Sequence, residues 1–274
     1  MKVAGGACTK EENGVGVGQW EIIDTGERSG GENMAFDESL ARRRAEGTGA
    51  STVRFFRWKP WAISVGYNQG TGELDAARCA ADGIAIVRRP TGGRAIFHAD
   101  ELTYSVVMPA GRKSILEIYN EISRALLRGL ALYGVEASLQ KSQPNFAEEY
   151  RNPSSVPCFS SSARYEIEWR GRKLVGSAQR RYAGGDGDAV LQHGSILCGP
   201  SHLRLADYLC LEDVALAARI RRVLKEKTVD LAEITGAPVD ATALAACLRR
   251  GFELEWNITF VPAAAGGIRV PQPV

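Results

Sequence analysis

Two stretches of the sequence carry side chains that can do chemistry, and the first is a turn rich in arginine and glycine. Arg88 and Arg89 precede Pro90-Thr91-Gly92-Gly93, and Arg94 and His98 follow it. Glycines let backbone N–H groups approach a ligand closely, and arginines neutralise phosphate or grip carbonyl oxygens. The motif is not a P-loop, because GxxxxGK[ST] is absent. The residues alone fit either a ligand-binding turn or a plain hairpin turn with solvated arginines.

The second stretch combines a cysteine and a lysine. Cys158 lies near the end of a loop rich in Ser and Pro at 142–162, and Lys173 begins a segment that continues through Gly176-Ser177-Ala178. If the loop folds back, the ammonium can lie beside the thiol and lower its pKa, which is ordinarily about 8.5. The small residues after Lys173 leave space for a ligand. Taken alone, such a pair is more often a buried structural cysteine and a surface lysine.

A histidine further along the chain is a third candidate. His193 lies in a strand interrupted by Gly194, where it can line a pocket or satisfy a hydrogen bond in the core. The sequence has no CxxC pair and no Cys/His cluster with zinc spacing, so we expect no metal site.

Strands and helices must position these residues. Alternating or continuous apolar runs predict strands in the first two thirds of the chain. They fall at 21–23, 52–58, 62–66, 84–89, 95–98, 102–108, 165–169, 173–180 and 190–197.

Helices are predicted between and after these strands. Asn33 can cap a helix from Met34 to about Arg44, and a short helix is expected near 74–82. Ser114 and Glu117 form a capping box for a helix that Gly134 stops. Gly129 falls on the apolar face of that helix, where it would let a neighbour approach closely. The chain after Ser201 is mostly helical, and Asp240 can cap its last helix. Strands followed by covering helices indicate an α+β domain with mixed or antiparallel sheets.

Composition sets the limits on function. The 274 residues carry 34 basic and 32 acidic side chains, a net charge of +2 that indicates no nucleic-acid partner. No apolar run approaches the about 18 residues of a membrane span, so no membrane association is expected. Six unpaired cysteines are typical of a reducing cytoplasm. We expect a disordered lead over 1–19, a single domain over 20–260 with its core at about 47–254, and a tail over 261–274.

Together, four motifs resemble the biotin/lipoate protein ligase superfamily. Asn33–Glu38 resembles its opening helix, and Arg88–Ala95 with His98 and Glu101–Ser105 resembles its acyl-binding signature. The segments 171–179 and 191–195 complete the pattern. The resemblance runs from about Trp20 to Phe260 and implies the catalytic-domain fold of that superfamily.

Within the superfamily, the sequence is most similar to the octanoyltransferase branch that looks like lipoate ligase A. ATP-dependent lipoate ligases usually have a third glycine where this chain has Arg94, and an Asn-Asp pair in the segment around Cys158. They often carry an accessory C-terminal domain, for which 274 residues leave no room. Pro157-Cys158-Phe159 ahead of the lysine motif resembles the octanoyltransferases, in which the cysteine is acylated and the lysine lowers its pKa.

The resemblance implies a reaction and its participants. Cys158 and Lys173 would be catalytic, moving octanoyl from octanoyl–acyl carrier protein through an acyl-cysteine thioester to a lysine of a lipoyl domain. The acceptor would be a protein such as the glycine cleavage H protein or a 2-oxoacid dehydrogenase E2 subunit, and no cofactor would be needed. The expected substrate-binding residues come from the arginine-rich turn and three strands. They are Arg88, Arg89, Thr91, Gly92, Gly93, His98, Tyr104, Gly176, Ser177, Ala178 and His193.

Three alternatives stay open at this point. An ATP- and magnesium-dependent lipoate or octanoate ligase would use the same pocket without Cys158. An amidotransferase that moves octanoyl between lipoyl domains would share the acyl-cysteine and differ only in its donor. A non-catalytic module that binds lipoyl domains would bind its partner without turnover.

Overall fold

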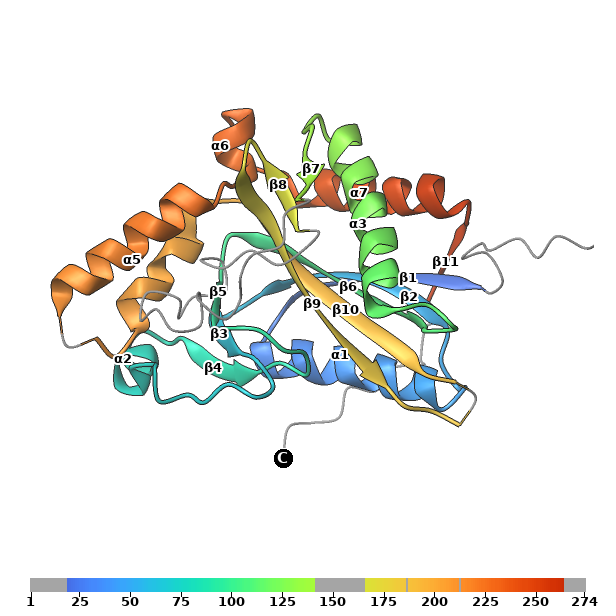
Figure 1. Ribbon diagram of the computed structural model, residues 1–274, viewed down its shortest axis with the longest axis horizontal. Coiled ribbons are helices and arrows are strands. Elements are labelled where there is room, and N and C mark those ends of the chain that lie inside the picture. Colours follow the sequence, from blue (N-terminus) through green and yellow to red (C-terminus); the bar gives the residue numbers. More distant parts are fainter. Residues whose placement is uncertain (1–18, 141–165, 186, 212, 264–274) are drawn as a thin grey trace, which may run out of the picture.

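The computed structural model describes residues 19–140, 166–185, 187–211 and 213–263. A mixed sheet of eight strands forms its centre, in the order β11-β1-β2-β6-β10-β9-β8-β7, and helices cover both faces (Figure 1). Three further strands form a small second sheet in the order β4-β3-β5. The single α+β domain predicted from the sequence is confirmed.

Five strands of the large sheet extend beyond their predicted ends, β8 is shorter than predicted, and β7 and β11 are not among the predicted strands. β1 is parallel to both β2 and β11, whereas β6, β10, β9, β8 and β7 continue the sheet in antiparallel pairs. The strand bounds are β1 (Trp20–Arg28), β2 (Ser51–Trp58), β6 (Glu101–Pro109), β7 (Ser138–Leu139), β8 (Ile167–Trp169), β9 (Arg172–Tyr182), β10 (Ala189–Leu197) and β11 (Phe260–Pro262). β11 therefore continues two residues past the expected end of the domain.

The small sheet presents the arginine-rich turn. It consists of β3 (Ala62–Val65), β4 (Ala85–Arg88) and β5 (Ile96–His98), with β3 parallel to β4 and antiparallel to β5. Its apolar side chains pack with those of η3 (Pro200–Tyr208) and α5 (Val214–Lys227). The turn between β4 and β5 is therefore held by a sheet that is itself packed against two helices.

The first helix begins earlier than predicted. α1 (Gly30–Ala45) is capped by Ser29 and not by Asn33, because Ser29 and Glu32 form a reciprocal capping box. Asn33 lies within the helix, fully buried, and its amide donates to the carbonyl oxygens of Arg28 and Arg57. Two glycines in the first turn hid this start from propensity reasoning.

Two helices cross closely on the other face of the large sheet. α3 (Ile115–Leu132) has the predicted capping box of Ser114 and Glu117, and it packs on α7 (Ala241–Trp256), which Asp240 caps (Figure 1). A Cβ on Gly129 would lie 2.6 Å from the Cα of Leu248. The prediction that Gly129 admits a close neighbour is confirmed.

The remaining helices among the described residues are α2 (Ala76–Ala81) and α6 (Leu231–Thr235). Within the described part of the chain, no helix has both the length and the apolar character to cross a bilayer.

Candidate active site

The turn predicted to bind a ligand is held in shape by its own arginines. The guanidinium of buried Arg89 donates to the carbonyl oxygens of Ser64, Gly92 and Arg94 at 2.7–3.1 Å. Nη1 of Arg88 donates to three carbonyls within residues 66–69, each at 2.8 Å. Arg88 therefore anchors a neighbouring loop, whereas Arg89 borders the cavity beneath the turn.

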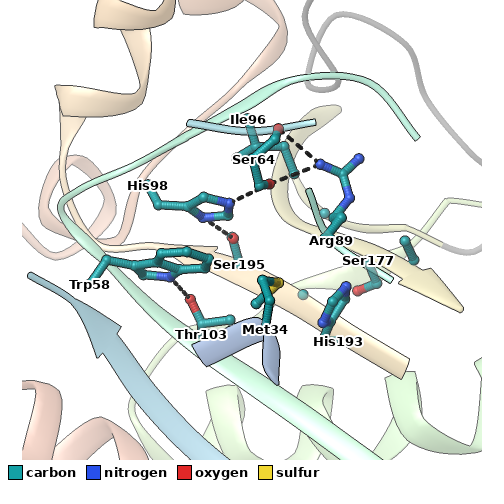
Figure 2. A pocket seen from close by; sticks show the side chains of 13 residues that line it. Met34, Trp58, Ser64, Arg89, Ile96, His98, Thr103, Ser177, His193 and Ser195 are labelled. Carbon is teal, nitrogen blue, oxygen red and sulfur yellow. Dashed lines mark hydrogen bonds between the residues drawn. The ribbon is translucent and has the colours of Figure 1, made fainter. Parts of the chain in front are cut away.

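That cavity lies between the small sheet, α1 and the middle of β9 and β10 (Figure 2). Of the predicted substrate-binding residues, Arg89, His98, His193 and the Gly176–Ala178 segment line it. The other lining residues come from α1 and from both sheets. They are Met34, Trp58, Ser64, Ile96, Thr103, Gly194 and Ser195.

A chain of hydrogen bonds fixes the first histidine of the cavity wall. Nδ1 of His193 lies 3.1 Å from Oδ2 of Asp37, and Nε2 lies 2.6 Å from the hydroxyl of Thr91. Burial lowers the pKa of His193, so the ring is neutral at pH 7 although Asp37 opposes the shift. Nδ1–H therefore donates to the carboxylate, and Nε2 accepts the proton of Thr91.

Asp37 is itself held by a buried cation. Nη1 of Arg54 donates to Oδ1 of Asp37 at 2.7 Å, and the hydroxyl of Ser105 donates to the same oxygen at 2.8 Å. Burial alone would raise the pKa of Asp37, but Arg54, His193 and Ser105 hold it below its usual value. Both side chains of the ion pair are fully buried. The imidazole of His193 is thus oriented by a carboxylate that is fixed on its far side.

The second histidine is held in the same way. Nδ1 of His98 lies 2.8 Å from Oε1 of Glu101, and Nε2 lies 2.7 Å from the hydroxyl of Ser64. The indole of Trp58 stacks on the imidazole, with the ring centroids 3.8 Å apart. The indole N–H donates to Thr103, whose hydroxyl donates to Glu101 at 2.5 Å. Figure 2 shows Trp58, His98 and Thr103 together along one side of the cavity.

Because of these two hydrogen-bond networks, the cavity wall is largely apolar although many of its residues are polar. Both ring nitrogens of His98 and of His193 are occupied by partners in the wall, so the rings present carbon to the cavity. Met34, Ile96 and Trp58 contribute further carbon surface. A wall whose polar atoms bond one another suits an alkyl chain, because no donor or acceptor loses a water partner when the chain enters.

Five predicted binding residues do not line the cavity, namely Arg88, Thr91, Gly92, Gly93 and Tyr104. The ring of Tyr104 packs in the main core, and its hydroxyl is 2.7 Å from both Ser177 and Gln192. Tyr104 supports the cavity floor from the opposite face of the sheet. Gly92 and Gly93 line a separate surface hollow with Arg94.

The predicted catalytic lysine is buried in an ion pair that the sequence did not reveal. Nζ of Lys173 lies 2.6 Å from Oε1 of Glu166, and the two side chains are 5 % and 4 % exposed. Cys158, the other predicted catalytic residue, lies outside the described residues.

The fold and the cavity can be compared with known proteins. Residues 29–253 match the family described as the lipoyl protein ligase A/B catalytic domain. The chain belongs to this family. Among the curated relatives, the octanoyltransferase LipM of Symbiobacterium thermophilum is 39% identical over 249 residues, or 89% of this chain and 88% of its own length. The octanoyltransferase LipM of Kyrpidia tusciae is 39% identical over 238 residues, or 85% of each chain.

Solved structures of the family share the fold. A bipartite lipoate protein ligase of Thermoplasma acidophilum superposes with a TM-score of 0.72 at 21% identity, covering 89% of this chain and 86% of its own. A lipoate-protein ligase A bound with ATP gives a TM-score of 0.68 at 22% identity, covering 89% and 87%. The catalytic-domain fold expected from the resemblance is confirmed.

Several residues of this family member's site escaped sequence reasoning. Asp37, Ser64 and Trp58 were not among the predicted site residues, although a polar Ser64 inside an apolar strand is a usable signal. The alternating segment 165–169 predicts Glu166 and Glu168 on one face of a strand. A register shift between Ile167 and Glu168 breaks that alternation, and Glu166 is buried.

Proposed function

We propose that this protein is an octanoyltransferase that acts in protein lipoylation, moving octanoyl from octanoyl–acyl carrier protein to a lysine of a lipoyl domain. The observation that carries the proposal is the similarity to proteins named octanoyltransferase over 85–90% of the chain at 34–39% identity. The apolar surface of the cavity supports it, because an eight-carbon acyl chain needs such a wall.

Two transfers at one thiol account for the reaction. The Cys158 thiolate, formed by loss of a proton to solvent, attacks the carbonyl carbon of the donor thioester. The bond to the pantetheine sulfur breaks, and that thiolate takes up a proton. The neutral ε-amine of the acceptor lysine then attacks the octanoyl-cysteine. A C–N bond forms, the C–S bond breaks, and the amine proton passes to the departing Cys158 thiolate.

No nucleotide is needed for this sequence of steps. An amide is more stable than a thioester, so the second transfer is downhill without ATP. A thiol nucleophile needs a reducing compartment, and Cys79, Cys198, Cys210 and Cys247 are free thiols in the described part of the chain. We place the enzyme in the cytoplasm on that ground.

Intact mass spectrometry tests the proposal. Mixing the protein with octanoyl–acyl carrier protein, without ATP, is expected to add one octanoyl group that neutral hydroxylamine removes. Adding a lipoyl domain should discharge the adduct and acylate the domain. An acylated domain formed only when ATP and octanoate are present would contradict the proposal and identify a ligase.

Trp58 is expected to limit the acyl chain length. It is buried, and it borders both the cavity and a second groove on its other side. Trp58→Ala should join the two spaces and admit a longer chain. Four extra buried methylenes contribute about 3 kcal/mol, which corresponds to a rise of about a hundredfold in the dodecanoyl-to-octanoyl ratio of kcat/KM.

Trp61 provides the matched control for this measurement. Trp61 borders the second groove and does not line the cavity, so Trp61→Ala should leave the chain-length ratio unchanged. A folded Trp58→Ala enzyme with the wild-type ratio would show that Trp58 does not set the length.

A further inference from the structure

The buried pair of Lys173 and Glu166 stands at the start of β9. The backbone of Lys173 is pinned on one side by β8 and on the other by Val229, whose N–H donates to the Lys173 carbonyl at 3.0 Å. Its ammonium meets Oε1 of Glu166 at 2.6 Å. The backbone and the side chain of the lysine are therefore both held in place by neighbours.

A buried ion pair adds little net stability to the contact between two strands. Removing an ammonium and a carboxylate from water costs several kcal/mol each, and their attraction often does no more than balance that cost. The adjacent Arg172 forms a 2.5 Å pair with Glu233 that is 26 % and 48 % exposed and makes a connection without this desolvation. A role in the reaction accounts for the buried pair better than a role in stability does.

We propose that Glu166 is a positioning residue that holds the ammonium of Lys173 in place, so that the lysine acts in octanoyl transfer as a fixed positive charge. The inference rests on the proposed function. An ammonium held by a carboxylate already carries its proton, so it cannot accept one from the attacking amine. It stabilises anions instead, namely the attacking thiolate and the oxyanion of each tetrahedral intermediate.

The proton balance of the two transfers agrees with this role. In the first transfer, the thiol proton goes to solvent and the leaving pantetheine thiolate takes one back. In the second, the amine proton ends on the sulfur of Cys158. Neither step leaves a proton for Lys173, so its constant charge is sufficient.

Single-turnover acylation followed by intact mass tests the role of Glu166. Glu166→Gln should lower the maximal acylation rate about a hundredfold, as expected for a misplaced catalytic group, with the half-saturating donor concentration unchanged. Glu166→Asp keeps the charge on a shorter arm and should recover part of the loss. Lys173→Arg, a permanent cation, should acylate faster than Lys173→Gln.

A double variant separates positioning from simple support of the fold. If Glu166 acts through Lys173, the Glu166→Gln/Lys173→Gln enzyme acylates no more slowly than Lys173→Gln alone. Glu233→Gln, which removes the neighbouring exposed pair, should stay near the wild-type rate. A Glu166→Gln rate near wild type, multiplicative losses in the double variant, or Lys173→Arg as inactive as Lys173→Gln would each overturn the inference.

These outcomes are distinct from a failure of the proposed function. A wild-type enzyme that takes up no octanoyl group refutes octanoyl transfer through Cys158. A wild-type enzyme that is acylated at the same rate as Glu166→Gln refutes the role of Glu166 alone.

Discussion

Cys158→Ala is expected to abolish octanoyl transfer, with a fall in rate of about a thousandfold or more. The proposed reaction passes through a thioester on this sulfur, and a methyl group cannot form one. Loss of the nucleophile leaves only the rate that binding and electrostatic stabilisation supply together. The measurement is transfer of octanoyl to a lipoyl domain without ATP.

Two other cysteines, Cys79 and Cys198, serve as controls for this variant. Cys79 is buried, and burial raises the pKa of Cys198 to about 12, so neither thiol suits nucleophilic attack. Cys79→Ala and Cys198→Ala should therefore keep the octanoyl adduct. Persistence of the adduct in Cys158→Ala would place the acyl group on another residue and refute the assignment.

Arg54→Met is expected to destabilise the fold by about 3–5 kcal/mol, because it leaves the buried charge of Asp37 without its cation. Arg54 is fully buried, donates to Asn33 and Thr25 as well, and stacks over the ring of Phe56 at 3.9 Å. Urea unfolding is the measurement, and the midpoint should fall without a change in m.

Acid and a second substitution check the cause of that loss. Arg54 holds the pKa of Asp37 in the folded protein below its usual value. The ion pair therefore stabilises the fold fully above the pKa of Asp37 in the unfolded chain, and this stabilisation is lost as the pH falls through the pKa in the folded protein. In Arg54→Met, burial without the cation raises the pKa of Asp37, so the variant takes up this proton at a higher pH than the wild type, and its deficit should shrink toward pH 4. Asp37→Leu added to Arg54→Met should restore part of the stability.

Arg42→Met, which breaks an exposed pair with Glu38, should cost about 1 kcal/mol or less. An Arg54→Met deficit that does not change with pH would contradict this explanation.

The sequence predicts the scaffold well and the polar interior poorly. Most strand positions follow from apolar runs, and the capping box of α3 and the role of Gly129 follow from local chemistry, so these were found. The start of α1 was missed, because Gly30 and Gly31 weaken the helical pattern just where Ser29 and Glu32 cap it.

The site is partly predictable for a different reason. His98, His193 and the 176–178 strand carry the family signature, and they line the cavity. Asp37 and Glu101 lie within the same signature segments, but their roles depend on the side chains that their carboxylates meet across the fold, His193 for Asp37 and Ser195 for Glu101. Those meetings join residues 156 positions apart in one case, a distance that no local pattern spans.

The arrangement of β11 beside β1 has a consequence for how the chain is made. Trp20, the first residue of β1, pairs with Phe260, so a ribosome must release nearly the whole polypeptide before this contact can form. Until then, one edge of β1 shows unpaired backbone groups to any other strand in reach. Premature termination upstream of Phe260 therefore leaves this edge of β1 unpaired, and the truncated product should be prone to self-association.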